Sequence, residues 1–210
     1  MPNYCWNYVE FKSDNKTHLK SLQSKLTYAK DYDYFSDFCL WVLSKQTRKN
    51  PKVDGFDEAM SLYDYAYQFG TKWWDIHENT IDGDTLVVSG DSARGPPQPF
   101  IEEICKTYNM TAHMTYEEPG ADFGGEAWYN EHGEVEDRCY EYQQWRYMNC
   151  ENLREYFDEE LWCCFEDEDL EEFKYSLNEH YKWLTKADRI QFEKWFVEAQ
   201  KQQAIRTSEE

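Results

Sequence analysis

The feature of this sequence with the clearest chemical meaning is a concentration of carboxylates. The segment 116–137, YEEPGADFGGEAWYNEHGEVED, holds eight Asp and Glu residues and no Lys or Arg. A second acidic block, EDEDLEE, occupies residues 166–172. Carboxylates grouped in this way can hold a metal ion, attract a basic partner, or simply face water. The neighbouring residues decide between these interpretations.

Most of the excess of acids over bases lies in one quarter of the chain. Of the 42 Asp and Glu residues, 20 lie within residues 117–172, where only 3 Lys and Arg occur. Residues 1–116 carry 16 acids against 12 bases, and residues 173–210 carry 6 against 7. The excess therefore belongs to a defined segment. A solvated face without any partner would carry the same charge, because water and salt screen such repulsion.

Metal-binding and catalytic interpretations find little support in the sequence. The acidic block lacks the D-x-D-x-D-G frame of a calcium loop, and the five histidines show neither HExxH nor a paired ligand spacing. Cys163 and Cys164 have no histidine base nearby in sequence, and no glycine loop of the phosphate-binding type occurs. We therefore predict no metal, no cofactor and no enzymatic activity.

A basic partner is the interpretation that the acidic residues favour. Carboxylates on successive helical turns can resemble the phosphates of a duplex, which carries about one charge per 1.7 Å, and so occupy a basic groove. An acidic face that binds a basic protein without such mimicry is also open. We predict contact with a basic host protein through acids and aromatic anchors. The acids are Glu159, Glu160, Glu166, Asp167, Glu168 and Asp169, and the anchors are Trp128, Tyr140, Tyr142 and Trp162.

The alternative is an accessory module that binds nucleic acid directly. Basic residues gather in the loop 45–52, and Trp6 and Tyr8 alternate along a predicted strand as in RNA-binding sheets. Phosphate binding needs a positive surface, which the net charge of -20 opposes, so direct nucleic-acid binding ranks second. We expect instead that the C-terminal helices bury both aromatic side chains.

Hydrophobic periodicity and turn residues divide the first 142 residues into alternating strands and helices. The predicted strands are 4–11, 70–77, 84–91 and 110–118, and the predicted helices are 15–28, 100–108, and two pieces at 34–44 and 56–69 within an insert at about 31–69. This order is that of the split βαβ arrangement, so we predict an α+β, ferredoxin-like domain over residues 1–142.

An added hairpin completes this predicted domain. Pro119 and Gly120 suit the two central positions of a type II turn. The segments GGEAWYN at 124–130 and VEDRCYEY at 135–142 resemble two strands joined by a turn. The acidic stretch is therefore expected to lie on and around this hairpin.

Beyond residue 142 the pattern becomes helical. Phe192, Trp195 and Phe196 recur at the spacing of one helical face, and we interpret His180 as a core residue on a similar face. We therefore predict an acidic helical extension at 143–204 and a short tail at 205–210.

The cysteines and the chain start bear on the cellular setting. Seven cysteines without CxxC spacing predict reduced, mostly buried thiols. The start MPNYCWNYVEFK has no basic lead followed by an apolar run, and no window approaches the ~20 apolar residues of a membrane span. We therefore expect the cytoplasm of a host cell and no contact with a membrane.

Four short motifs resemble a known protein family. They are MPNYCWN at 1–7, GTKWW at 70–74, GPPQPFIEEI at 95–104 and YEEPGADFGGEAWY at 116–129. Together they resemble small phage- and plasmid-encoded proteins with a ferredoxin-like domain, which begin MPNWC and carry GTKW and an EPG turn. The resemblance implies the fold and a mobile-element origin, and no reaction. The chain departs from it at Tyr4, where Trp is usual, and at GDSARGPP, where Trp-Ser-Pro-Pro is usual.

Overall fold

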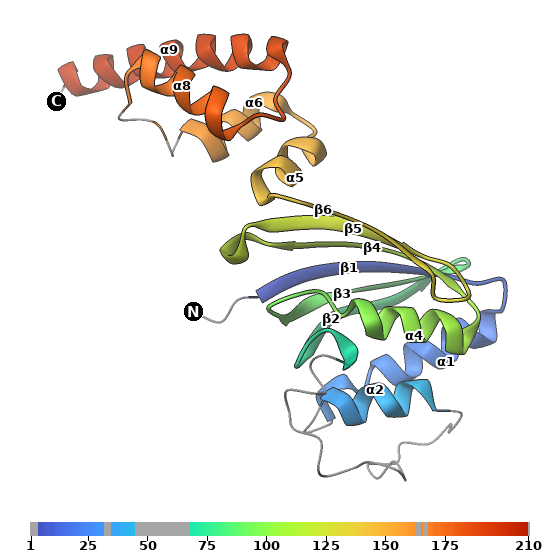
Figure 1. Ribbon diagram of the computed structural model, residues 1–210. Coiled ribbons are helices and arrows are strands. Elements are labelled where there is room, and N and C mark those ends of the chain that lie inside the picture. The colour runs from blue at the N-terminus through green and yellow to red at the C-terminus, as the bar shows by residue number, and fades with distance from the viewer. Residues whose placement is uncertain (1–3, 32–34, 45–67, 163–164, 166–167, 210) are drawn as a thin grey trace. The chain divides into compact units, whose positions relative to one another are not determined.

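The chain forms two compact units, Met1–Tyr142 and Gln143–Glu210 (Figure 1). This computed structural model describes residues 4–31, 35–44, 68–162, 165 and 168–209. The predicted basic loop 45–52 and most of the predicted helix 56–69 lie outside the described residues. Among the described residues, none of the helices combines the length and apolar character needed to span a bilayer.

A six-stranded antiparallel sheet forms the body of the first unit. Its strands are β1 (Tyr4–Lys12), β2 (Trp74–Asp82), β3 (Thr85–Ala93), β4 (Thr111–Glu118), β5 (Phe123–Tyr129) and β6 (Val135–Tyr140). Their order in the sheet is β2-β3-β1-β4-β5-β6, and every neighbouring pair is antiparallel. The first strand is therefore central, and the β5–β6 hairpin extends the sheet beyond β4.

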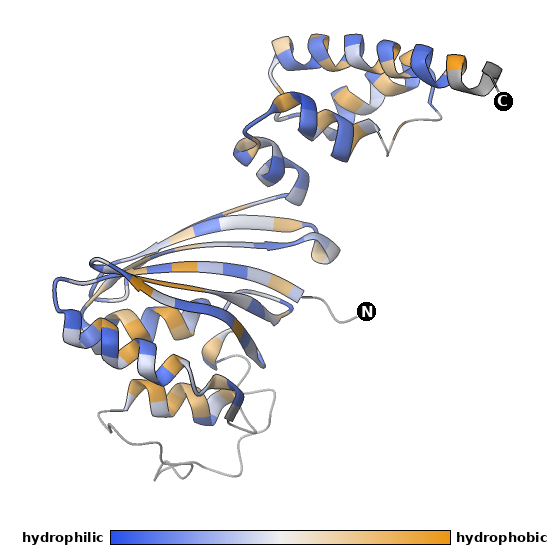
Figure 2. Ribbon diagram, turned by 180° about the vertical axis from the view of Figure 1, so that it is seen from behind, coloured by the Kyte–Doolittle hydropathy of each residue, from blue (hydrophilic) through white to orange (hydrophobic). Residues whose placement is uncertain are grey.

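Three helices lie on one face of this sheet: α1 (Lys16–Leu26), α2 (Phe35–Leu43) and α4 (Gln98–Tyr108) (Figure 1). Apolar and polar residues alternate along them (Figure 2), so each has a side that can be buried. Val9 and Phe11 of β1 pack with Leu22 of α1 and Phe100 of α4 in the core. The mixture of helices and antiparallel sheet makes this unit α+β.

Two local predictions differ from the structure. Pro119–Ala121 forms a 3-10 helix, and Asp122 (φ 58°) takes the left-handed conformation that a type II turn would give to Gly120. Asp tolerates this conformation, and its Oδ1 accepts a hydrogen bond from the Tyr142 N–H at 3.3 Å. Strand β2 begins at Trp74 rather than at residue 70. Just before it, the Ala93 N–H of β3 donates both to the Thr71 hydroxyl at 2.9 Å and to the Trp73 carbonyl at 3.2 Å.

The second unit consists of helices around an aromatic core. They are α5 (Tyr142–Asn149), α6 (Leu153–Tyr156), the π-helix η3 (Phe157–Trp162), α8 (Leu170–His180) and α9 (Lys186–Glu209). The rings of Phe173 and Phe196 stack with centroids 4.1 Å apart. Helix α9 continues past residue 204, where the predicted extension ends. The core prediction for His180 is wrong: His180 ends α8 and is exposed, and Tyr181 packs inward instead.

Candidate partner-binding surface

The sheet has a second face, turned away from α1 and α4, which we call the distal face. On β1 the residues Cys5, Val9 and Phe11 are fully buried against the helices, whereas the alternating side chains point the other way. Of these, Trp6 is 40% exposed, and Tyr8 is half-buried. Within the first unit the Trp6 side chain is therefore open on the distal face, and its burial beneath the C-terminal helices stays a prediction.

Carboxylates flank Trp6 on both neighbouring strands. The strand register places Trp6 opposite Asp91 of β3 and opposite Glu117 of β4. Directly opposed residues on one face of an antiparallel pair have Cβ atoms about 4.5–5.5 Å apart. Asp91 Oδ2 lies 3.4 Å from His77 Nε2, and within the described residues neither carboxylate forms an ion pair with Lys or Arg.

A second tryptophan on the distal face already holds a cation. Trp128 of β5 stacks on His113 of β4, with centroids 5.1 Å apart and planes inclined by 13°. The guanidinium carbon of Arg138 on β6 lies 4.9 Å from the Trp128 ring centroid. Arg138 Nη2 also lies 2.7 Å from Glu136 Oε1. The predicted anchor Trp128 is thus half-buried between a histidine and an arginine of its own chain.

The structure separates the other predicted anchors. Tyr140 is half-buried on β6, on the same face as Arg138. Tyr142 begins α5 and its N–H bonds to Asp122. Trp162 packs on Phe196, with ring centroids 5.7 Å apart, beside the aromatic core of the second unit. Only Trp128 and Tyr140 therefore share the distal face.

The predicted acids have mixed roles. Glu159 is exposed and lies 3.6 Å from Arg146 Nη2. Asp169 caps α8, because its Oδ1 accepts from the N–H groups of Glu171 and Glu172 at 2.9 Å each. Glu168 is half-buried, and this burial raises the pKa of its carboxyl group. The described part of the chain does not include the Glu160 side chain, Glu166 or Asp167.

The cations within the acidic segment are already engaged. Its three arginines each pair with an acid: Arg138 with Glu136 at 2.7 Å, Arg146 with Glu159 at 3.6 Å, and Arg154 with Asp158 at 2.8 Å. Exposed pairs of this kind contribute little stability, about 0–1 kcal/mol each. They leave most of the 20 acids of residues 117–172 without an arginine from that segment.

Described parts of the resemblance motifs lie together at one end of the sheet, where Trp6 pairs with Glu117 and the Tyr4 ring lies 5.3 Å from the Trp73 ring. Asn7 is fully buried, and its Nδ2 donates to the Cys5 carbonyl at 2.8 Å and to Ser92 Oγ at 2.7 Å. The Ser92 hydroxyl donates in turn to the Gly95 carbonyl at 2.8 Å. Burial raises the pKa of the Cys5 thiol to about 12, so this thiol stays protonated and inert. These hydrogen bonds join the ends of neighbouring strands.

Glu118 of the same motif region gives a testable pH dependence. Its side chain is 2% exposed, Oε2 has no hydrogen-bond partner, and burial raises the pKa of the carboxyl group. A raised pKa in the folded state means that stability falls as the pH rises from the pKa of the unfolded chain through that of the folded state, because the unfolded chain gives up this proton more easily. The substitution Glu118→Gln should increase the melting temperature at pH 7 and change it little at pH 4. Thermal unfolding at both pH values checks this, and equal shifts would contradict it.

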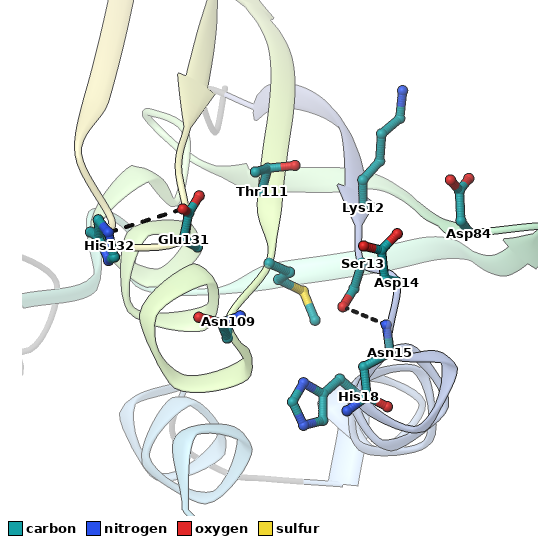
Figure 3. Close-up of a pocket in the computed structure, with 11 residues that line it drawn as sticks. Lys12, Ser13, Asp14, Asn15, His18, Asp84, Asn109, Thr111, Glu131 and His132 are labelled. Atoms are coloured by element: carbon teal, nitrogen blue, oxygen red, sulfur yellow. Dashed lines mark hydrogen bonds and ion pairs between the residues drawn. The ribbon is translucent and has the colours of Figure 1, made fainter.

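A pocket of about 500 Å³ lies at the opposite end of the sheet (Figure 3). Its polar groups largely bind one another: Ser13 Oγ accepts from the Asn15 N–H at 3.2 Å, and Asn15 Oδ1 caps α1 through the Thr17 N–H at 3.0 Å. His18 Nδ1 lies against the Tyr108 carbonyl. The lining also mixes Lys12 with three acids, Asp14, Asp84 and Glu131, so no single ligand charge is favoured.

Other chemical sites find no support in the described part of the chain, where no three His, Cys, Asp or Glu side chains lie close enough together to hold a metal ion. Among the cysteines there, Cys5, Cys39 and Cys105 are buried free thiols, while Cys139 is exposed and Cys150 half-buried. Among the described residues, the candidate site is therefore the acidic and aromatic distal face of the sheet.

Comparison with known proteins identifies the class of fold. Residues 73–161 match the family model described as the ferredoxin-like domain in Api92-like protein. The chain therefore contains a ferredoxin-like domain, as its motifs imply. Among solved structures, the crystal structure of protein api92 from Yersinia pseudotuberculosis is similar, with 11% identity and a TM-score of 0.40, covering 67% of this chain and 98% of that chain. No curated protein matches.

Proposed function

We propose that this chain is a non-enzymatic protein of a phage or other mobile element that binds a basic surface of a host protein and blocks it. The observation that carries the proposal is uncompensated charge: residues 117–172 hold 20 acids, and the three arginines among them are already paired. An acidic segment of this kind accelerates encounter with a basic protein and repels nucleic acid. The motif resemblance supports the mobile-element origin.

We place the partner among host proteins that handle nucleic acid, including defence proteins. Their grooves are basic because they accept phosphates, so an acidic protein surface can compete for the same groove. The strand order supports the finer assignment of the first domain to a split βαβ core extended by a hairpin. The proposal further places the protein in the cytoplasm of the host cell.

Reversal of exposed acids tests the proposal. We choose four acids that lie in the acidic segment and do not cap a helix: Glu141, Glu151, Glu155 and Glu159. Changing all four to Lys should abolish capture of the partner from host lysate, because the attraction becomes a repulsion. To measure capture, the variant is immobilised, host lysate is passed over it, and the amount of host protein retained is quantified.

A matched variant separates the acidic segment from total charge. Four exposed acids outside residues 117–172 can receive the same reversal: Asp14, Asp82, Asp84 and Glu179. This variant has the same net charge as the first and should keep most of the capture. Equal loss in both variants, or unchanged capture by the first, would refute the assignment to the acidic segment.

One observation favours the second candidate, direct binding of nucleic acid. Trp6 is 40% exposed on a sheet, where a base could stack. Its neighbours Asp91 and Glu117 oppose this, because phosphates would approach two carboxylates. A mobility-shift assay at low salt distinguishes the candidates: a shift with strong salt dependence would favour the nucleic-acid module.

A further inference from the structure

The distal face contains, within its own chain, an example of how it can hold a guanidinium group. Arg138 lies over the Trp128 ring, 4.9 Å from the centroid, and bonds to the Glu136 carboxylate at 2.7 Å. Glu136 is the residue paired with Trp128 on the next strand. On this sheet an arginine placed by its own strand thus stacks on a tryptophan ring and pairs with a carboxylate beside that ring.

Trp6 repeats this set of groups. It is 40% exposed and pairs across the sheet with Asp91 on one side and Glu117 on the other. Two carboxylates thus flank the Trp6 ring, whereas the Trp128 ring has one such carboxylate, that of Glu136 on β6. Within the described residues no Lys or Arg pairs with either Asp91 or Glu117, so the negative charge around Trp6 lacks the compensation that Arg138 gives to Trp128.

The groups that follow Trp6 along β1 extend the surface in one direction. The Tyr8 ring is stacked on the Trp6 ring, with centroids 6.2 Å apart, and the Tyr8 hydroxyl donates to Glu10 Oε1 at 3.3 Å. Successive side chains on one face of a strand are about 6.8 Å apart. An extended peptide along β1 would present alternate side chains at the same interval, so alternating basic residues fit this row of aromatic and acidic groups.

We infer that Trp6, Asp91 and Glu117 form a binding site for an arginine side chain that a partner protein presents on an extended basic segment. The inference rests on the proposed function and names the chemistry of the partner. Arginine suits the site better than lysine, because its planar guanidinium stacks on the indole ring while its N–H groups reach carboxylates at the ring's sides. The net charge of -20 disfavours RNA at the same position.

Titration with defined peptides tests the inference. The probe is a peptide that alternates arginine and glycine, measured by isothermal titration at low salt against the full chain. Replacing each arginine by citrulline, a neutral analogue of similar shape, should abolish binding, and replacing it by lysine should weaken binding about threefold or more. Trp6→Ala should weaken binding of the arginine peptide about tenfold. The double variant Asp91→Asn with Glu117→Gln should do the same.

Two controls match these changes on the second unit. Tyr175, which is 66% exposed on α8, gives Tyr175→Ala as an aromatic control, and Glu179→Gln removes an exposed charge on the same helix, outside the acidic segment. Both should leave peptide affinity within about twofold, since neither residue belongs to the distal face. The carboxamide double variant preserves side-chain shape, so it tests the site even where Trp6→Ala fails to fold.

The outcomes decide between the inference and its alternatives. No measurable binding, or binding that both the Trp6 and the carboxamide variants leave unchanged, would overturn the site. Equal affinity for lysine and arginine peptides, or tighter binding of single-stranded RNA, would also overturn it. If the Trp6 variant loses peptide binding but still captures the partner from lysate, the arginine site exists but does not serve the proposed function. If only the Glu-to-Lys reversals abolish capture from lysate, the proposed function holds and the arginine site takes no part in it.

Discussion

Replacing Lys25 by Met should lower the free energy of unfolding by about 3 kcal/mol, because a buried ammonium group with several acceptors is lost. Lys25 is 6% exposed. Its Nζ donates to the carbonyls of Trp41, Val42 and Ser44 at 3.3, 3.0 and 2.7 Å. Two of these carbonyls belong to the last turn of α2, where the Trp41 oxygen also accepts from the Ser44 hydroxyl and the Val42 oxygen from the Tyr108 hydroxyl.

The net effect combines two opposing contributions. Burial lowers the pKa of Lys25, which shows that the charged form loses hydration in the folded state. Met recovers that loss but removes three charge-assisted hydrogen bonds to carbonyl oxygens, and this second contribution is the larger. Chemical denaturation measures the change. The matched control is Lys20→Met on the exposed side of α1, which should change stability by less than about 0.5 kcal/mol.

Replacing Gly90 by Ala should destabilise the first unit by about 3 kcal/mol or more, because an added methyl group would overlap backbone atoms. A Cβ atom at this position would lie 2.1 Å from the Asp75 carbonyl oxygen. The close approach occurs where β2 shifts register between Ile76 and Glu78. A glycine within a strand is typical of such an irregularity.

The position of Gly90 also affects the candidate site. Pairing of β2 with β3 places Asp75 opposite Asp91, which flanks Trp6. A variant that separates these strands should therefore lose peptide binding together with stability. Gly95→Ala is the matched control, since no atom lies within 4 Å of the position that its added methyl group would occupy, and stability should change by less than about 0.5 kcal/mol. Equal melting temperatures for both variants would contradict the account of Gly90.

Sequence periodicity was sufficient to predict the helices and strands that are marked by residues in or next to them. Leucines at helical spacing and the cap residue Asn15 mark α1, and Pro99 in the first turn marks α4. Asp82 and Gly83 mark the turn between β2 and β3, where Gly83 has φ 62°. In each of these cases the residues that determine the element lie within one or two turns of it.

The distal site has no local signal. Trp6, Asp91 and Glu117 come from three strands that are far apart in sequence and become neighbours only through the strand register. Lys25 is similarly hidden, since it follows Leu22 on a helix and nothing in the sequence places carbonyl groups around its amine. The roles of these residues depend on contacts between elements that are distant in sequence, and hydrophobic periodicity does not predict such contacts.

One missed role did have a signal in the sequence. Asp169 followed by Glu172 is the pattern of a capping box, and both of its hydrogen bonds form at the start of α8. The sequence pattern predicted Asp169 as a partner contact instead. In a segment with many carboxylates, those that cap helices are difficult to distinguish from those that face a partner. Glu159, which is exposed and caps no helix, is the better choice for charge reversal.

Capture from host lysate at two salt concentrations tests the central claim most directly. The immobilised full chain should retain a basic protein at about 50 mM NaCl and release most of it at about 500 mM, because salt screens attraction between exposed charges. The variant with Glu141, Glu151, Glu155 and Glu159 changed to Lys should retain none of that protein. Retention by both proteins alike, or retention of nucleic acid alone, would contradict the claim that the acidic surface binds a basic partner.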